Sequence, residues 1–145
     1  MIKRDNMKII WFLGVLYIIT IIVSMGCISS KNDTFTTSKE ISPGLITSLQ
    51  LKEMLKKKDF VLINVHTPYA GEIEGTDYNI PYNEISSRIK EIVPNGAKIV
   101  VYCRSGAMSS YAYYELKKIG YENVYDLKEG MNNWKLKGGK LIYKN

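Results

Sequence analysis

The chain has 145 residues, of which 46% are hydrophobic and 23% are charged. This composition leaves room for one folded domain of ordinary size and excludes an intrinsically disordered chain. The formal net charge is +6, which raises the question of nucleic-acid binding. However, the lysines are scattered, and the one tight run, residues 56–58, is typical of the solvated end of a helix. We therefore expect no nucleic-acid partner.

An uncharged, mostly apolar stretch occupies residues 9–25 and follows a basic flank. Its length is compatible with an export signal or with a short membrane anchor. The segment Ser24-Met25-Gly26-Cys27 then resembles a prokaryotic lipobox, which implies that Cys27 is lipidated. Both possibilities place the rest of the chain outside the cytoplasmic membrane and tethered to it, because the positive flank stays inside.

These features predict three parts of the chain. Residues 1–26 form the signal peptide or membrane anchor, and residues 27–44, which are mostly polar, form a flexible linker. Residues 45–145 form the folded domain. The oligomeric state is left open by these patterns.

The folded part begins with a short strand at 45–47 and a helix whose start carries a capping box, Thr47 and Gln50. The elements expected after it are a strand over 60–65, a long irregular segment, a helix over 85–93, a strand over 99–102, a helix over 109–119, a strand at 124–125 and a helical turn over 131–134. This alternation predicts an α/β fold, with a small parallel sheet covered by helices on both faces.

Three local signals refine these elements. Ile85, Ile89 and Ile92 recur at helical spacing and are expected on the buried side of their helix. The segment 94–96, Pro-Asn-Gly, predicts a turn after that helix. Gly120 is expected to end the helix over 109–119 at a C′ position.

The residue with the most functional information is Cys103, which ends the apolar strand over 99–102 and opens a short polar loop. A sulfur between the carboxyl end of a parallel strand and the start of a helix lies among unpaired N–H groups, which favour the thiolate. Arg104 adds a cation, and Gly106 allows the backbone to approach a ligand closely. A buried structural cysteine is the simpler alternative, because most single cysteines are small core residues.

Several segments together resemble a single rhodanese-like domain, over roughly residues 45–143. They are the strand over 61–66, the segment 71–81, the loop over 103–108, the helix after it and the segment 130–134, Gly-Met-Asn-Asn-Trp. The resemblance implies that Cys103 accepts a sulfane sulfur as a persulfide from a small anionic donor. It then passes the sulfur to a thiol or cyanide-like acceptor, and no cofactor is needed. The residues expected to bind the anion are Arg104, Ser105, Gly106, Ala107, Met108 and Ser109.

The chain also departs from the family pattern at four positions. Asn64 and His66 stand where an Asp and an Arg are common, Glu72 stands where a His is common, and Met108 replaces a basic or hydroxyl residue. A loop with one cation should bind a dianion such as thiosulfate less firmly. These departures keep a second hypothesis open, a catalytically silent rhodanese-like module that binds a partner or carries sulfur.

The remaining candidates have simple alternatives. His66 is the only histidine, so it could act as an accessory base, although a structural role is favoured. Asp126 and Glu129 could approach the site or could cap helices. Tyrosine phosphatase activity is not expected, because such enzymes carry an arginine at the sixth position after the cysteine, where this chain has Ser109. Neither a disulfide nor a metal site is expected from two distant cysteines and one histidine.

Overall fold

The computed structural model of the chain describes residues 43–144, which contain a five-stranded parallel sheet. The order of the strands is β1-β6-β5-β2-β4, and every neighbouring pair is parallel. The strands are β1 (Gly44–Ile46), β2 (Val61–Asn64), β4 (Tyr78–Asn79), β5 (Ile99–Tyr102) and β6 (Val124–Leu127). A separate antiparallel pair consists of β3 (Glu72–Ile73) and β7 (Leu141–Ile142).

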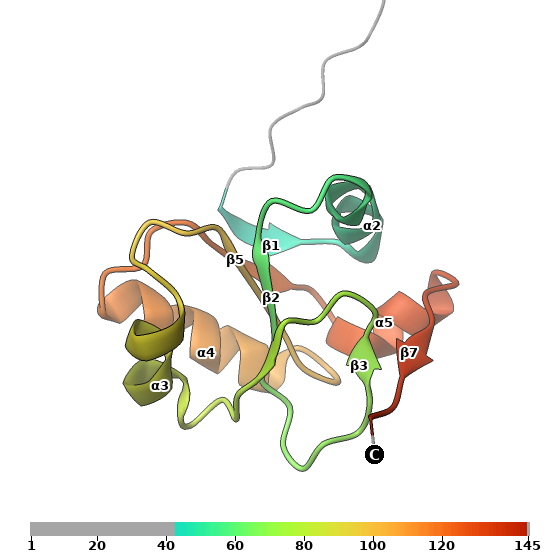
Figure 1. Cartoon of the computed structure of the whole chain (residues 1–145). Coiled ribbons are helices and arrows are strands. Elements are labelled where there is room, and N and C mark those ends of the chain that lie inside the picture. The colour runs from blue at the N-terminus through green and yellow to red at the C-terminus, as the bar shows by residue number, and fades with distance from the viewer. Residues whose placement is uncertain (1–42, 145) are drawn as a thin grey trace, which may run out of the picture. The chain divides into compact units, whose positions relative to one another are not determined.

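Helices cover both faces of the five-stranded sheet. In Figure 1, α3 (Ile85–Ile92) and α4 (Ala107–Lys118) lie on the left, and α2 (Ser48–Lys56) and α5 (Gly130–Leu136) lie on the right. Alternate residues of each strand serve the two faces: Ile63 and Val101 belong to the cluster with α3 and α4, whereas Leu62 and Val100 belong to the cluster with α2 and α5. The predicted α/β architecture is therefore confirmed.

Local sequence signals place several element ends correctly. The Thr47 side chain accepts a hydrogen bond from the Gln50 N–H at 3.2 Å, and the Thr47 N–H donates to the Gln50 side chain at 2.8 Å. This reciprocal pair is the capping box that was predicted at the start of α2. Gly120 follows α4 with a φ of +97°, as expected for a residue that ends a helix in the left-handed region.

Some expectations were wrong in detail. The segment expected to be irregular contains the short strands β3 and β4, and β7 was not expected, because two-residue strands are too short to produce a period. Ile92 is 38% exposed, and Val93 lies in the core instead, since the chain leaves the helix at this point. The helix α4 starts at Ala107 rather than at residue 109.

The apolar stretch over 9–25, the lipobox-like Cys27 and most of the expected linker lie outside the described residues. Within 43–144, the structure contains no helix with the length and apolar character that crossing a bilayer requires.

Candidate functional site

Cys103 lies directly after β5, the central strand of the sheet, and its side chain is 1% exposed. The Gly106 N–H donates a hydrogen bond to the Cys103 Sγ over 3.1 Å. The loop thus folds back on the sulfur, as predicted from its position between a parallel strand and a helix. An N–H donor at this distance stabilises a negative charge on sulfur more than it stabilises the neutral thiol.

The loop is tighter than expected because α4 begins early. Gly106 has a φ of +102° and precedes the first helical residue, so Ala107 to Ser109 form the first turn of α4. The first N–H groups of a helix have no partner within the helix. Glycine is required at 106 because a side chain there would adopt a disfavoured φ and would lie 3.3 Å from the Glu129 nitrogen.

The six residues expected to bind an anion differ in exposure. Arg104 and Ser105 are exposed in the loop, and Ala107 is exposed at the start of α4. Met108 is partly buried and packs against the hydrophobic cluster that also contains Cys103. Ser109 is fully buried, and its hydroxyl donates to the Gly106 oxygen over 3.0 Å. Ser109 therefore contributes to the loop's geometry and presents no charge to a ligand.

A contact between the loop and α5 was missed by the sequence analysis. The Met131 N–H donates to the Cys103 oxygen over 2.9 Å, and the Asn132 N–H donates to the Arg104 oxygen over 3.0 Å. Gly130 makes this approach possible, because a Cβ at this position would overlap with the Cys103 carbonyl group. The available signal was the Gly130 that opens the segment 130–134, but its partner is 27 residues away in the sequence (130 − 103).

The two acidic candidates do not cap helices with their side chains. Glu129 precedes α5 with a φ of +60°, and its carboxylate accepts a hydrogen bond from Asn133 rather than from a helix N–H. Asp126 lies on β6, is 2% exposed, and accepts a hydrogen bond from the Ser110 hydroxyl. Of the two, Asp126 is the one in the protein interior beside the start of α4.

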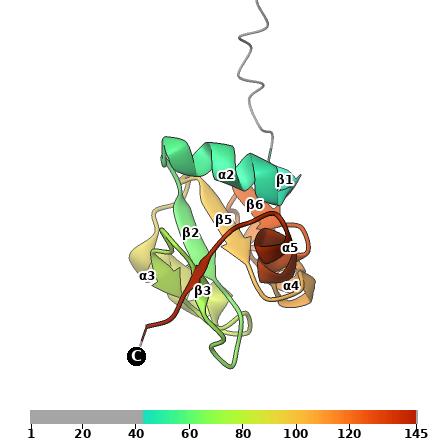
Figure 2. The same cartoon turned by 90° about the vertical axis from the view of Figure 1, so that its right-hand side faces the viewer.

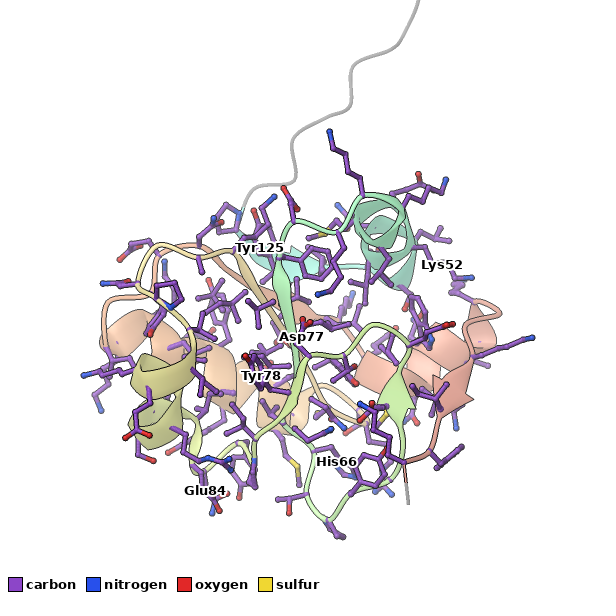
Figure 3. The ribbon with its side chains drawn as sticks, viewed as in Figure 1. Lys52, His66, Asp77, Tyr78, Glu84 and Tyr125 are labelled. Atoms are coloured by element: carbon purple, nitrogen blue, oxygen red, sulfur yellow. The ribbon has the colours of Figure 1, made fainter. Side chains whose placement is uncertain are left out.

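His66 lies just beyond the carboxyl end of β2, in the lower part of Figure 3. The Val65 N–H donates to the Tyr102 oxygen over 2.8 Å, which holds this end of β2 beside the start of the loop. Partial burial lowers the pKa of His66, and the positive charge of Arg104 lowers it further. The imidazole is thus mostly neutral at neutral pH, and its Nδ1 has no hydrogen-bond partner among residues 43–144.

Asn64 and Glu72, two of the departures from the family pattern, both have polar partners for their side chains. The Asn64 amide donates to the Gly71 oxygen over 3.1 Å, and its oxygen accepts from the His66 N–H over 3.1 Å. Glu72 is fully buried and forms an ion pair with Lys144. The contacts of Asn64 brace the segment between β2 and β3, and the ion pair of Glu72 joins β3 to the C-terminal segment.

No group of three or more potential metal ligands occurs in the described part of the chain. The sixth position after Cys103 holds the buried Ser109, so the arginine that binds phosphoryl oxygens in tyrosine phosphatases has no counterpart there.

Residues 47–137 match the family model of the rhodanese-like domain. A sulfurtransferase from Allochromatium vinosum is 34% identical over 87 residues, which are 59% of this chain and 80% of that protein. A tRNA uridine(34) hydroxylase from Neorickettsia sennetsu is 28% identical over 127 residues, which are 80% of this chain but 43% of that protein. The solution structure of the rhodanese-like domain from the Anabaena Alr3790 protein superimposes with a TM-score of 0.65 and 26% identity, covering 72% of this chain and 81% of that domain.

Proposed function

The chain belongs to the rhodanese-like domain family, and on this basis we propose that it is a sulfurtransferase in which Cys103 carries the transferred sulfur. The observation that carries the proposal is the hydrogen bond from the Gly106 N–H to the Cys103 Sγ, in a loop that ends at the start of α4. This arrangement is suited to a sulfur that is an anion before and after it accepts a second sulfur atom.

The proposed reaction has two steps. The Cys103 thiolate attacks the sulfane sulfur of the donor, so that a new S–S bond forms and the donor's own bond to that sulfur breaks. With thiosulfate, sulfite leaves with the electron pair of the broken bond and Cys103 becomes a persulfide anion. An acceptor thiolate or cyanide then attacks the outer sulfur, and Cys103 leaves as the thiolate. No oxidant, reductant or cofactor is consumed.

The side chains around the loop limit which donor is favoured. Arg104 is exposed and can attract an anion, whereas Met108 is apolar and Ser109 is turned into the interior. Each charge-assisted hydrogen bond that a dianion lacks costs about 1.5–3 kcal/mol. We therefore expect mercaptopyruvate, a donor with one carboxylate charge, to react better than thiosulfate.

The test uses the full-length chain in detergent micelles. The protein is incubated with thiosulfate, with mercaptopyruvate and with a polysulfide, and its intact mass is measured before and after addition of cyanide. We expect a one-sulfur adduct that cyanide removes as thiocyanate, and we expect no adduct on Cys103→Ser. Absence of an adduct from every donor, or an adduct that persists in Cys103→Ser, would contradict the proposal.

A silent module that binds a partner or carries sulfur is the second candidate. It is favoured by the low exposure of Cys103, 1%, which a donor must overcome to reach the sulfur. In its partner-binding form, this candidate predicts that Cys103 forms no adduct with any of the three donors, and that a partner protein is recovered by crosslinking at the membrane. The same mass measurement therefore separates the two.

We also propose that the domain is held at the outer face of the cytoplasmic membrane. The apolar stretch over 9–25, its basic flank and the lipobox-like position of Cys27 support this location. The donor and acceptor would then be molecules that reach the extracytoplasmic side.

A further inference from the structure

Asp126 is a buried acid for which the proposed chemistry has no use. It lies on β6 with 2% of its surface exposed, and it is paired in register with Val101 of β5, two residues before Cys103. Its position alternates with that of Tyr125, so its side chain is on the sheet face that α4 covers, the face that also holds Val101 and Cys103. Burying a carboxyl group is costly unless its contacts compensate.

The contacts of Asp126 lead to the first turn of α4. Its Oδ2 accepts a hydrogen bond from the Ser110 Oγ over 2.7 Å. Burial raises the pKa of Asp126, while the neighbouring Ser109 and Ser110 hydroxyl groups oppose the rise. The Oδ1 atom is buried and has no hydrogen-bond partner among the described residues. Within residues 43–144, the hydrogen bond that holds the carboxyl group therefore comes from Ser110.

The same two serines hold Gly106. The Gly106 oxygen accepts a hydrogen bond from the Ser109 Oγ over 3.0 Å and another from the Ser110 N–H over 2.9 Å. The Gly106 N–H points at the Cys103 Sγ over 3.1 Å. Glycine can adopt a wider range of backbone φ and ψ angles than any other residue. The Gly106 N–H therefore keeps this direction only if its neighbours restrain the backbone.

We propose that Asp126 is a positioning residue for Cys103, which acts through Ser110 and the first turn of α4 to keep the Gly106 N–H directed at the sulfur. The inference rests on Cys103 being the reactive sulfur of the proposed function. Asp126 touches neither donor nor acceptor; it anchors the first turn of α4 to β6, and that turn anchors the loop.

The test measures the reactivity of Cys103 directly and needs no sulfur donor. The full-length chain is alkylated with iodoacetamide over a range of pH, and the rate is followed by mass spectrometry on the tryptic peptide 99–104, which contains Cys103. The variants are Asp126→Asn, Asp126→Ala and Ser110→Ala. Asp126→Asn removes the charge but keeps an oxygen that accepts from Ser110, so its comparison with Asp126→Ala isolates the hydrogen bond.

We expect Asp126→Ala to react about tenfold more slowly than Asp126→Asn at neutral pH, the effect of misdirecting one charge-assisted hydrogen bond. Its rate profile should also move to higher pH. Ser110→Ala should change the rate and the profile in the same direction. Equal rates for Asp126→Ala and Asp126→Asn would overturn the proposal; if Asp126→Ala does not fold, a Ser110→Ala variant that reacts like the wild type would overturn it.

Tyr121→Phe is the matched control. The Tyr121 hydroxyl is buried in the same core cluster and donates to the Val93 oxygen over 2.7 Å, beyond the far end of α4. Its loss removes one buried hydrogen bond but leaves the loop untouched, so Cys103 should be alkylated at the wild-type rate. A slowed Tyr121→Phe would show that general loosening of the core explains the effect, and would overturn the proposal.

The alkylation experiment tests the positioning role separately from sulfur transfer. If no donor forms a persulfide but Asp126→Ala still slows alkylation, the proposed function fails and the positioning role stands. If persulfide forms but alkylation is the same in all variants, the proposed function stands and the positioning role fails.

Discussion

At the scale of single residues, Gly130 allows the start of α5 to dock on the loop that follows Cys103. It has a φ of +54°, and the helix that it opens donates two N–H groups to the Cys103 and Arg104 oxygens. These two carbonyl groups thus point towards α5, while the Gly106 N–H points at the sulfur. Any side chain at 130 meets both the disfavoured φ and the Cys103 carbonyl group.

We predict that Gly130→Ala lowers the free energy of unfolding by about 3 kcal/mol or more, because backbone strain adds to a steric clash. Urea denaturation measures the change. The matched control is Gly96→Ala, at a φ of +97° with no atom within 4 Å of the added Cβ. That variant meets the strain alone, about 1–2 kcal/mol. Equal losses in the two variants would show that the loop does not dock on α5 as described.

At the scale of elements, β7 closes over β3 and fastens the C-terminal segment to the domain, as Figure 2 shows. The register pairs Glu72 with Ile142, and the following residue, Tyr143, lies against Gly71. The Lys144 side chain then reaches back to form the ion pair with Glu72. Burial alone would raise the pKa of Glu72, but hydrogen bonds from Lys144 and Asn79 outweigh it, so the pKa lies below its ordinary value.

We predict that Lys144→Met destabilises the domain at neutral pH, because Glu72 is then a buried carboxylate without its cation. A carboxyl group with a lowered folded-state pKa adds stability above its ordinary value of 4.5 and loses that contribution as the pH falls through the folded-state pKa. The difference between Lys144→Met and the wild type should therefore be greatest at neutral pH and should shrink in acid.

Urea midpoints at neutral pH and in acid measure this difference. Lys140→Met is the control, since Lys140 is exposed in the same segment and its side chain forms no ion pair within residues 43–144. It should match the wild type at both pH values. A destabilisation by Lys144→Met that does not change with pH would mean that packing of the lysine stem, rather than the charge pair, fastens the segment.

At the scale of the whole molecule, the sequence combines a folded domain with a long amino-terminal extension. The family match begins at residue 47, so the apolar stretch and Cys27 precede the domain that carries Cys103. A lipid on Cys27 would hold the domain at a membrane surface through the polar residues between them.

We predict that the full-length chain, produced in a bacterial host with labelled palmitate, incorporates the label and that Cys27→Ser does not. The reason is chemical, because the lipid would be attached through the sulfur of this cysteine. Cys103→Ser serves as the control and should be labelled like the wild type. An unlabelled wild-type chain whose mass still includes residues 1–26 would instead show an uncleaved membrane anchor.

The sequence by itself determined the α/β class, the order of the main elements and the position of the cysteine. Apolar strands, the Thr47 capping box and the Gly120 stop are local signals, because each depends on residues a few positions apart. The strand and loop around Cys103 are also contiguous in the sequence. For this reason a candidate site could be predicted, and the family resemblance seen, before any contact was known.

Only the tertiary structure decided which long-range contacts hold the loop and the C-terminal segment. The docking of the Cys103 and Arg104 oxygens on α5, the link from Asp126 through the serines of α4, and the ion pair between Glu72 and Lys144 each join residues that are far apart in the chain. Such contacts arise when strands pair and helices pack, and they leave no periodic trace in the sequence. The cysteine can therefore be recognised in the sequence. The residues that we propose to orient the Gly106 N–H beside its sulfur can be recognised only in the fold.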